Sequence, residues 1–205
     1  MNTFTIKPNS YLKHSVPGFF HYKYLGMNRP GNPDFINRLK NDNHSRGINE
    51  LMQDAEMVCD VLCKDLPNVV IQECLNRPVV CVMPRAKQNS KYTDAQLLFL
   101  DAVSNAVEIM SGMKNGTQWI TRMKPTQTTH LRYSYSFRDK GILPYEGITK
   151  DTCIISPKIK GRDIILVDDV YTIDVNVIED MLQTLLDAGA NKVVSYVVSK
   201  TSRCH

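Results

Sequence analysis

The chain has 205 residues, of which 42% are hydrophobic and 22% are charged, and its net charge is +4. This balance is typical of one globular domain, and the mild positive charge suits an anionic small ligand as well as nucleic acid. No apolar run approaches the ~20 residues of a membrane span, and the first residues do not resemble a signal peptide, so we expect a cytoplasmic protein.

The first 66 residues are predicted to form an aromatic and helical N-terminal region. Residues 19–24 alternate enough to be an edge strand, and residues 35–40 predict a short helix. Residues 50–66 predict a longer helix, because apolar side chains recur on one face and Pro67 follows as a stop signal.

The six cysteines include no Cys-x-x-Cys pair. Cys59 and Cys63 are four residues apart on the predicted helix, so their side chains share a face. This spacing suits two of the ligands of a metal site. No second pair has a matching spacing, so we interpret the cysteines as buried free thiols in a reducing compartment.

Residues 79–83 predict a buried strand that runs into a basic loop, and residues 94–110 predict the helix after it. Arg85 and Lys87 lie where a loop at a strand end would place them, with Ala86 between them. Their side chains are suited to binding a diphosphate, and a solvated loop is the alternative.

Residues 118–150 are polar, basic and aromatic, and we call this segment the hood. A short strand at 118–120 opens it. The segment is typical of an active-site cover, and nucleic-acid binding is the alternative.

The strongest signal is the aliphatic run 164–167, followed directly by Asp168 and Asp169. Such a run predicts a strand buried on both faces of a parallel sheet. A helical pattern over 178–186 follows and stops at Gly189, and a further aliphatic run occupies 193–198. The acidic pair therefore lies at the carboxyl end of a strand, where open α/β sheets bind their ligands.

Adjacent carboxylates at a strand end accept hydrogen bonds from a sugar diol or hold hydrated Mg²⁺ beside phosphates. The turn after them offers backbone amides to a phosphate. In the alternative interpretation, Asp169 or Asp174 caps the next helix. We favour capping for Asp174 and a functional role for the Asp168–Asp169 pair, because two charges that end a buried strand have little structural use.

These patterns together predict a single α/β domain over 1–205 with a central parallel sheet flanked by helices. The N-terminal region covers 1–66, and the core covers 79–205 with the hood at 118–150. The strands at 79–83, 164–167 and 193–198 are expected at the centre of the sheet, with helices on both faces and right-handed crossovers.

Residues 164–176 resemble the phosphoribosyl-diphosphate (PRPP) binding motif of the type I phosphoribosyltransferases, which has aliphatic residues, two acids and a phosphate loop. The wider similarity is to the ComF-like, amidophosphoribosyltransferase-related branch and covers about 79–201. It includes Met83-Pro84-Arg85, then Arg122, Thr126, Gln127 and Leu131, then Val167 to Val170, and finally Ala188-Gly189-Ala190 with Val193-Val194.

The resemblance implies a type I phosphoribosyltransferase-like fold, Mg²⁺ as the cofactor and a small-molecule phosphoribosyl donor. Asp168 and Asp169 would be the catalytic residues and would hold Mg²⁺, in part through the ribose hydroxyls. The implied substrate-binding residues are Arg85, Ala86, Lys87, Arg122, Tyr171, Thr172, Ile173, Asp174, Val175 and Asn176. The ribosyl group would pass to an acceptor that the sequence does not identify, with release of diphosphate. That acceptor would meet the hood, where Arg122, Tyr133 and Tyr135 are candidates for stacking or hydrogen bonding.

Two features depart from the family pattern. The branch often carries an N-terminal zinc-binding cysteine cluster, and this chain has none. The family's phosphate loop reads Thr-Thr-Gly-x-Thr, whereas this chain has Thr172-Ile173-Asp174-Val175-Asn176. A carboxylate in place of the glycine repels a phosphate, so we expect weak affinity for the 5′-phosphate.

Three hypotheses follow. The first is an active phosphoribosyltransferase, or a relative that acts on a modified donor. The second is a binding or regulatory protein of the same fold without turnover. The third is a nucleic-acid-linked effector that uses the basic hood. A homodimer is compatible with each of them.

Overall fold

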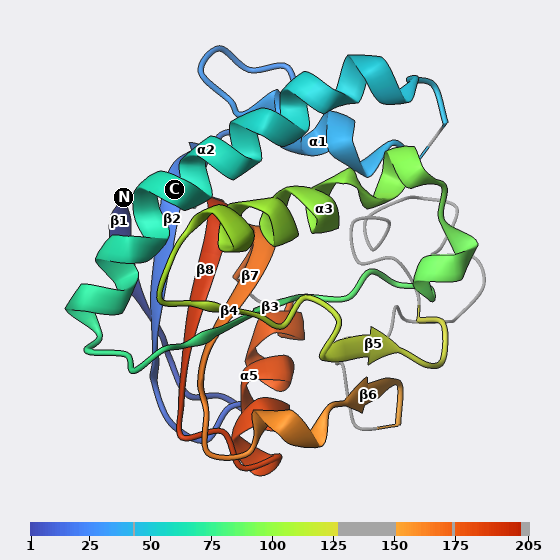
Figure 1. Cartoon of the computed structure of the whole chain (residues 1–205). Coiled ribbons are helices and arrows are strands. Elements are labelled where there is room, and N and C mark those ends of the chain that lie inside the picture. Colours follow the sequence, from blue (N-terminus) through green and yellow to red (C-terminus); the bar gives the residue numbers. More distant parts are fainter. Residues whose placement is uncertain (43, 127–150, 174, 202–205) are drawn as a thin grey trace.

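The computed structural model describes residues 1–42, 44–126, 151–173 and 175–201 (Figure 1). A mixed six-stranded sheet runs through the molecule in the order β1-β2-β8-β7-β3-β4, and β5 and β6 form a separate antiparallel pair. In chain order the strands are β1 (Asn2–Ile6), β2 (Val16–Tyr24), β3 (Val79–Val82), β4 (Lys114–Asn115), β5 (Ile120–Arg122), β6 (Cys153–Ile155), β7 (Asp163–Tyr171) and β8 (Lys192–Thr201).

The sheet is the middle layer of three. The helices are α1 (Asp34–Lys40), α2 (Ile48–Gln72), α3 (Asp94–Ile109) and α5 (Val177–Asp187). Figure 1 shows α2 and α3 over one face of the sheet and α5 on the opposite side. Ile165 and Val167 of β7 pack with the first group of helices, whereas Ile164 and Leu166 pack with α5. Burial on both faces explains why this strand is aliphatic from Ile164 to Val167.

The connections leave the middle of the sheet in opposite directions. From β3 the chain passes through α3 to β4 at one edge, and from β7 it passes through α5 to β8 on the other side. The strand order therefore reverses between β3 and β7. In open α/β sheets, the crevice at the carboxyl ends of two such strands is the usual place for a ligand.

Most of the predicted elements are present. The α/β class and the parallel strands β3, β7 and β8 are confirmed, as are α1, α3 and α5. Gly189 ends α5 with φ +90°, and its N–H bonds to Leu186 O at 2.9 Å while that of Ala190 bonds to Leu185 O at 3.1 Å. These are the paired bonds of a Schellman motif.

Several predictions about the elements were wrong. The sheet is mixed rather than parallel, because β1 pairs antiparallel with β2. The strand predicted at an edge is internal, because β8 pairs in parallel along β2. Helix α2 continues through Pro67, since the burial of Leu66 and Val69 on either side outweighs the lost hydrogen bond.

The strand of the acidic pair is also longer than predicted, because β7 runs on to Tyr171 and includes both acids. The short strand of the hood is β5, displaced to Ile120–Arg122, and it pairs with β6. Of the hood, residues 127–150 lie outside the described residues.

We predict that Gly116→Ala destabilises the fold, because Gly116 lies against the buried strand β3. A Cβ atom there would be 2.3 Å from Cγ1 of Val79, which is fully buried. Overpacking of this kind costs about 1–3 kcal/mol, measurable by urea denaturation. Gly47→Ala is the matched control, since its Cβ meets nothing within 4 Å, and an equal loss in both variants would contradict the prediction.

Candidate functional site

The acidic pair lies at an edge of β7 that its neighbour leaves open. β3 pairs with β7 as far as Val82 and Val167, and the last bond joins Met83 N to Val167 O at 2.9 Å. Beyond that point β7 continues beside β8 alone, with Asp168 opposite Val197. The carboxylates therefore lie at the carboxyl end of β3, at the point where the strand order reverses.

Both acids are half-buried, and each accepts a local hydrogen bond. Asp168 Oδ1 accepts the N–H of Asp169 at 2.9 Å, and Asp169 Oδ1 accepts the N–H of Val170 at 2.7 Å. Burial and then the charge of Asp169 raise the pKa of Asp168 well above its ordinary value. Neighbouring acids with a strongly shifted pKa are common at functional sites. The alternative that Asp169 caps the next helix is wrong, because Asp169 lies within β7.

A lysine from the N-terminal region forms an ion pair with one of the two acids. Lys40 Nζ lies 3.0 Å from Asp169 Oδ2, and both side chains are largely buried. Burial alone would lower the pKa of Lys40, but the charge of Asp169, its hydrogen bond and the charge of Asp168 together raise it. The sequence did not indicate Lys40, which lies far from Asp169 along the chain and in no motif.

The end of α1 is held over the sheet edge by ion pairs and capping bonds. Arg38 donates to both oxygens of Asp54 in α2, at 2.8 and 2.6 Å. Asn41 ends α1 in the left-handed region with φ 43°, and its carbonyl accepts from Gln96 Nε2 at 3.2 Å. These bonds fix the backbone from which Lys40 reaches Asp169.

Arg85 was predicted to bind a diphosphate, and the structure gives its guanidinium protein partners. Nη2 donates to Lys40 O at 3.0 Å and to Asp42 Oδ1 at 2.8 Å, and Nη1 donates to Gln96 O at 2.8 Å. The guanidinium also lies 4.3 Å from the ring centroid of Tyr92. Arg85 thus joins the loop after β3 to α1 and α3.

The rest of that loop is held through its backbone. The carbonyl of Ala86 accepts the N–H of Thr126 at 2.8 Å, and the N–H of Lys87 donates to the hydroxyl of Tyr92 at 3.1 Å. The side chain of Lys87 is exposed. Lys87 is therefore the basic side chain of this loop that is best placed to meet an anionic ligand.

Arg122 is a buried residue whose hydrogen bonds hold the loop after β3. It is 6% exposed, and it donates through Nε to Arg85 O at 3.0 Å and through Nη1 to Thr152 Oγ1 at 2.9 Å. These contacts make Arg122 a positioning residue for the loop after β3. The other hood candidates, Tyr133 and Tyr135, lie outside the described residues.

The loop after β7 combines one exposed side chain with several that are half-buried. Thr172 is exposed and Ile173, Val175 and Asn176 are half-buried, with the N–H of Val175 bonded to Thr172 O at 3.4 Å. Asn176 occupies the N-cap position of α5 with φ 64°, a position that we expected Asp174 to take. Asp174 itself lies outside the described residues.

Tyr171, also predicted to bind substrate, belongs to the core. Its side chain is 6% exposed, and its hydroxyl donates to Glu179 Oε1 at 2.7 Å. Its ring lies 4.9 Å from that of Phe4 in β1. The side chain therefore ties β7 to α5 and β1.

The donor set suits a magnesium ion that is held mainly by its substrate. Within the described ranges, no three His, Cys, Asp or Glu side chains gather as a metal cluster. Mg²⁺ commonly binds one or two carboxylates together with waters and substrate phosphates. Asp168 and Asp169 fit that mode of binding.

The described cysteines are free thiols, but the prediction that they are buried holds only for Cys81 and Cys153. Cys59 and Cys63 are half-buried, and Cys74 is exposed. Burial, and then the neighbouring Cys63, raises the pKa of Cys59 to about 11, and burial raises that of Cys81 to about 12. These thiols stay protonated at neutral pH, so nucleophilic chemistry at either is disfavoured.

Comparison with known proteins gives no family for the chain. No protein-family model matches it, and neither does any of the curated proteins with which it was compared. Among the described residues, no helix combines the length and the apolar character needed to cross a membrane.

We predict that Lys40→Met destabilises the protein at pH 7 by about 1–3 kcal/mol, between the values for exposed and buried ion pairs. The variant leaves Asp169 unpaired beside Asp168. The loss should shrink as the pH falls and Asp168 takes up a proton, because burial and the charge of Asp169 raise the pKa of Asp168 well above its ordinary value. Urea denaturation between pH 3 and 8 measures it.

The control for this prediction is Lys64→Met, which removes an exposed lysine from α2. That variant should change stability by less than about 0.5 kcal/mol at every pH. A loss in Lys40→Met that did not depend on pH would mean that Lys40 contributes packing and not charge.

Proposed function

We propose that the protein binds PRPP or a related ribose phosphate with Mg²⁺, and transfers the ribosyl group to an acceptor with release of diphosphate. The observation that carries the proposal is the position of Asp168 and Asp169. They lie at the carboxyl end of β3, where the strand order reverses, between the loops that follow β3 and β7. The α/β fold with this acidic edge supports a type I phosphoribosyltransferase-like architecture.

The residues at this edge suit the separate parts of such a donor. Asp168 and Asp169 would accept hydrogen bonds from the ribose hydroxyls and stabilise positive charge at the anomeric carbon. The exposed Lys87 and the loop after β3 would meet the diphosphate, to which Mg²⁺ would supply charge neutralisation. The described residues of the loop after β7, which are Thr172, Ile173, Val175 and Asn176, would meet the 5′-phosphate beside the N-terminus of α5.

The transfer itself asks little covalent chemistry of the protein. The bond between the anomeric carbon and the diphosphate oxygen breaks, and the diphosphate leaves with the electron pair. A nucleophilic atom of the acceptor forms the new bond and loses its proton. Positioning and electrostatics supply the catalysis. Lys40 would hold the carboxylate of Asp169 in place throughout, because its ammonium lies 3.0 Å from Asp169 Oδ2.

A binding or regulatory protein without turnover is the second candidate. Arg85 favours it, because its guanidinium is engaged by Asp42 and by two backbone carbonyls. An arginine held in this way is less able to follow a departing diphosphate. Ile173, which lacks a hydroxyl for the 5′-phosphate, favours it as well.

Calorimetric titration with PRPP and Mg²⁺, followed by an assay for diphosphate, separates the candidates. Binding with diphosphate release supports the transferase, and binding without release supports the regulatory protein. Failure to bind PRPP or another ribose phosphate would overturn both. Affinity for nucleic acid that falls steeply with salt would favour the effector hypothesis instead.

We predict that Asp168→Asn abolishes PRPP binding and raises stability at neutral pH. Burial raises the pKa of Asp168, so the folded protein bears a cost for the ionised form above that pKa. The asparagine has no charge, and its Oδ1 can still accept the N–H of Asp169. A gain of the order of 1 kcal/mol at pH 7 raises the melting temperature by about 2–4 °C in a chain of this size.

The gain should disappear as the pH falls toward the ordinary carboxyl pKa, where folded and unfolded chains both hold the proton. Asp187→Asn on α5 is the control, because it removes a more exposed carboxylate far from the site along the chain. Unchanged PRPP affinity in Asp168→Asn would show that the acidic pair is structural only.

A further inference from the structure

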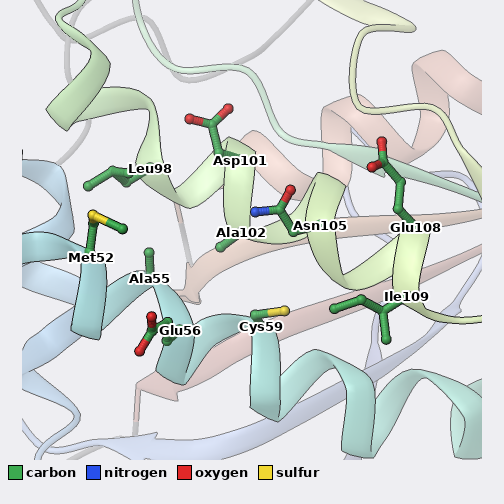
Figure 2. A pocket seen from close by; sticks show the side chains of 10 residues that line it. All are labelled: Met52, Ala55, Glu56, Cys59, Leu98, Asp101, Ala102, Asn105, Glu108 and Ile109. Atoms are coloured by element: carbon green, nitrogen blue, oxygen red, sulfur yellow. The ribbon is translucent and has the colours of Figure 1, made fainter.

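A groove separate from the acidic site runs between α2 and α3 (Figure 2). Its volume is about 530 Å³. Apolar side chains from both helices line it: Met52, Ala55 and Cys59 come from α2, and Leu98, Ala102 and Ile109 come from α3. In Figure 2 they follow the direction of the helices, from Met52 and Leu98 at one end to Ile109 at the other.

The groove exposes large apolar side chains to solvent. Met52 is 49% exposed and Ile109 is 72% exposed, and Ile48, Met57 and Ile71 of α2 add further exposed apolar surface to the same helix pair. Such surface commonly marks an interaction site. Methionine adapts to partners of different shape, because its side chain is flexible and polarizable.

All the charged side chains that line the groove are carboxylates, among the residues that the structure describes. They are Glu56 on α2 and Asp101 and Glu108 on α3. This sign is opposite to the net charge of +4 for the whole chain. Burial, and then the charge of Asp94, raises the pKa of Asp101, so a further carboxylate adds to the negative charge near this residue. The groove therefore suits a positively charged partner with an apolar stripe.

The charges also separate the classes of occupant. A nucleic acid would be repelled by the carboxylates. A second copy docked by a two-fold axis would bring Glu56, Asp101 and Glu108 against their own counterparts, because a two-fold interface places the same patch on both sides. A reactive-thiol site is disfavoured, since the pKa of Cys59 is raised to about 11.

We propose that this groove docks an amphipathic helix of a partner protein, with its apolar stripe on Met52, Leu98 and Ile109 and its Lys or Arg side chains against the carboxylates. Two neighbouring helices form a natural seat for a third, and amphipathic helices bind apolar grooves through side chains at helical spacing. The proposal does not depend on the proposed enzymatic function, because none of its residues belongs to the acidic site.

The test uses two model peptides of about five helical turns (~18 residues), one of leucine and lysine and one of leucine and glutamate. Fluorescence anisotropy with the full chain should show binding of the leucine–lysine peptide that weakens with salt, and no binding of the leucine–glutamate peptide. Asp101→Lys should lower the affinity for the leucine–lysine peptide about tenfold or more. Asp187→Lys, the same charge change on α5, should leave its affinity within about twofold.

A second pair of variants tests the apolar stripe. Met52→Lys should lower the affinity for the leucine–lysine peptide. Met27→Lys, at an exposed methionine outside the groove, should leave that affinity unchanged. Circular dichroism checks that each variant is folded. Equal effects within either pair of variants, or no binding of the leucine–lysine peptide, would overturn the proposal. A dimer of the unmodified chain that Met52→Lys dissociates would assign the groove to a second copy and would also overturn it.

Discussion

The unequal length of two paired strands determines where the polar groups of this protein can gather. β3 ends at Val82, whereas β7 continues to Tyr171 with only β8 beside it. From Ile164 to Val167, β7 is enclosed by β3 and β8 on its two sides and by helices on both faces, which explains why these side chains are aliphatic. Beyond Val167 that enclosure ends on one side, and two carboxylates become tolerable at the end of a buried strand.

The ionised form of Asp168 remains unfavourable in this position, as its pKa shows. Asp168 retains a raised pKa because burial and the neighbouring Asp169 both disfavour its charge. Lys40 compensates one of the two acids at 3.0 Å. An acidic pair with one cation for two carboxylates costs stability, and such costs commonly persist where a ligand needs the uncompensated charge.

The N-terminal region takes part in the candidate site. α1 supplies Lys40, and its last turn is tied to the loop after β3 through Arg85 and to α2 through Arg38. Asp42 holds the same Arg85. The loop expected to meet a diphosphate therefore moves only if the end of α1 moves with it. In the proposed function, these contacts would couple ligand binding at this loop to the N-terminal region.

The sequence by itself determined the elements whose signals are local. The aliphatic run before Asp168 indicated a strand enclosed on both faces, and the helical spacing that ends at Gly189 indicated α5, because periodicity and capping act over a few residues. The α/β class and the location of the acidic pair at the sheet edge follow from the same patterns. Pro67 misled the prediction, because local propensity does not include the burial of its neighbours.

Only the tertiary structure decided which distant residues share the site. Lys40 forms an ion pair with Asp169, and Arg85 donates hydrogen bonds to Asp42 and to the carbonyl of Gln96. The side chain of Tyr171 lies in the core, where it donates to Glu179. The order of the strands likewise placed β2 inside the sheet. Contacts between distant segments depend on how whole elements pack and leave no periodic trace in the sequence, so sequence patterns identified the acids but not the cation beside them.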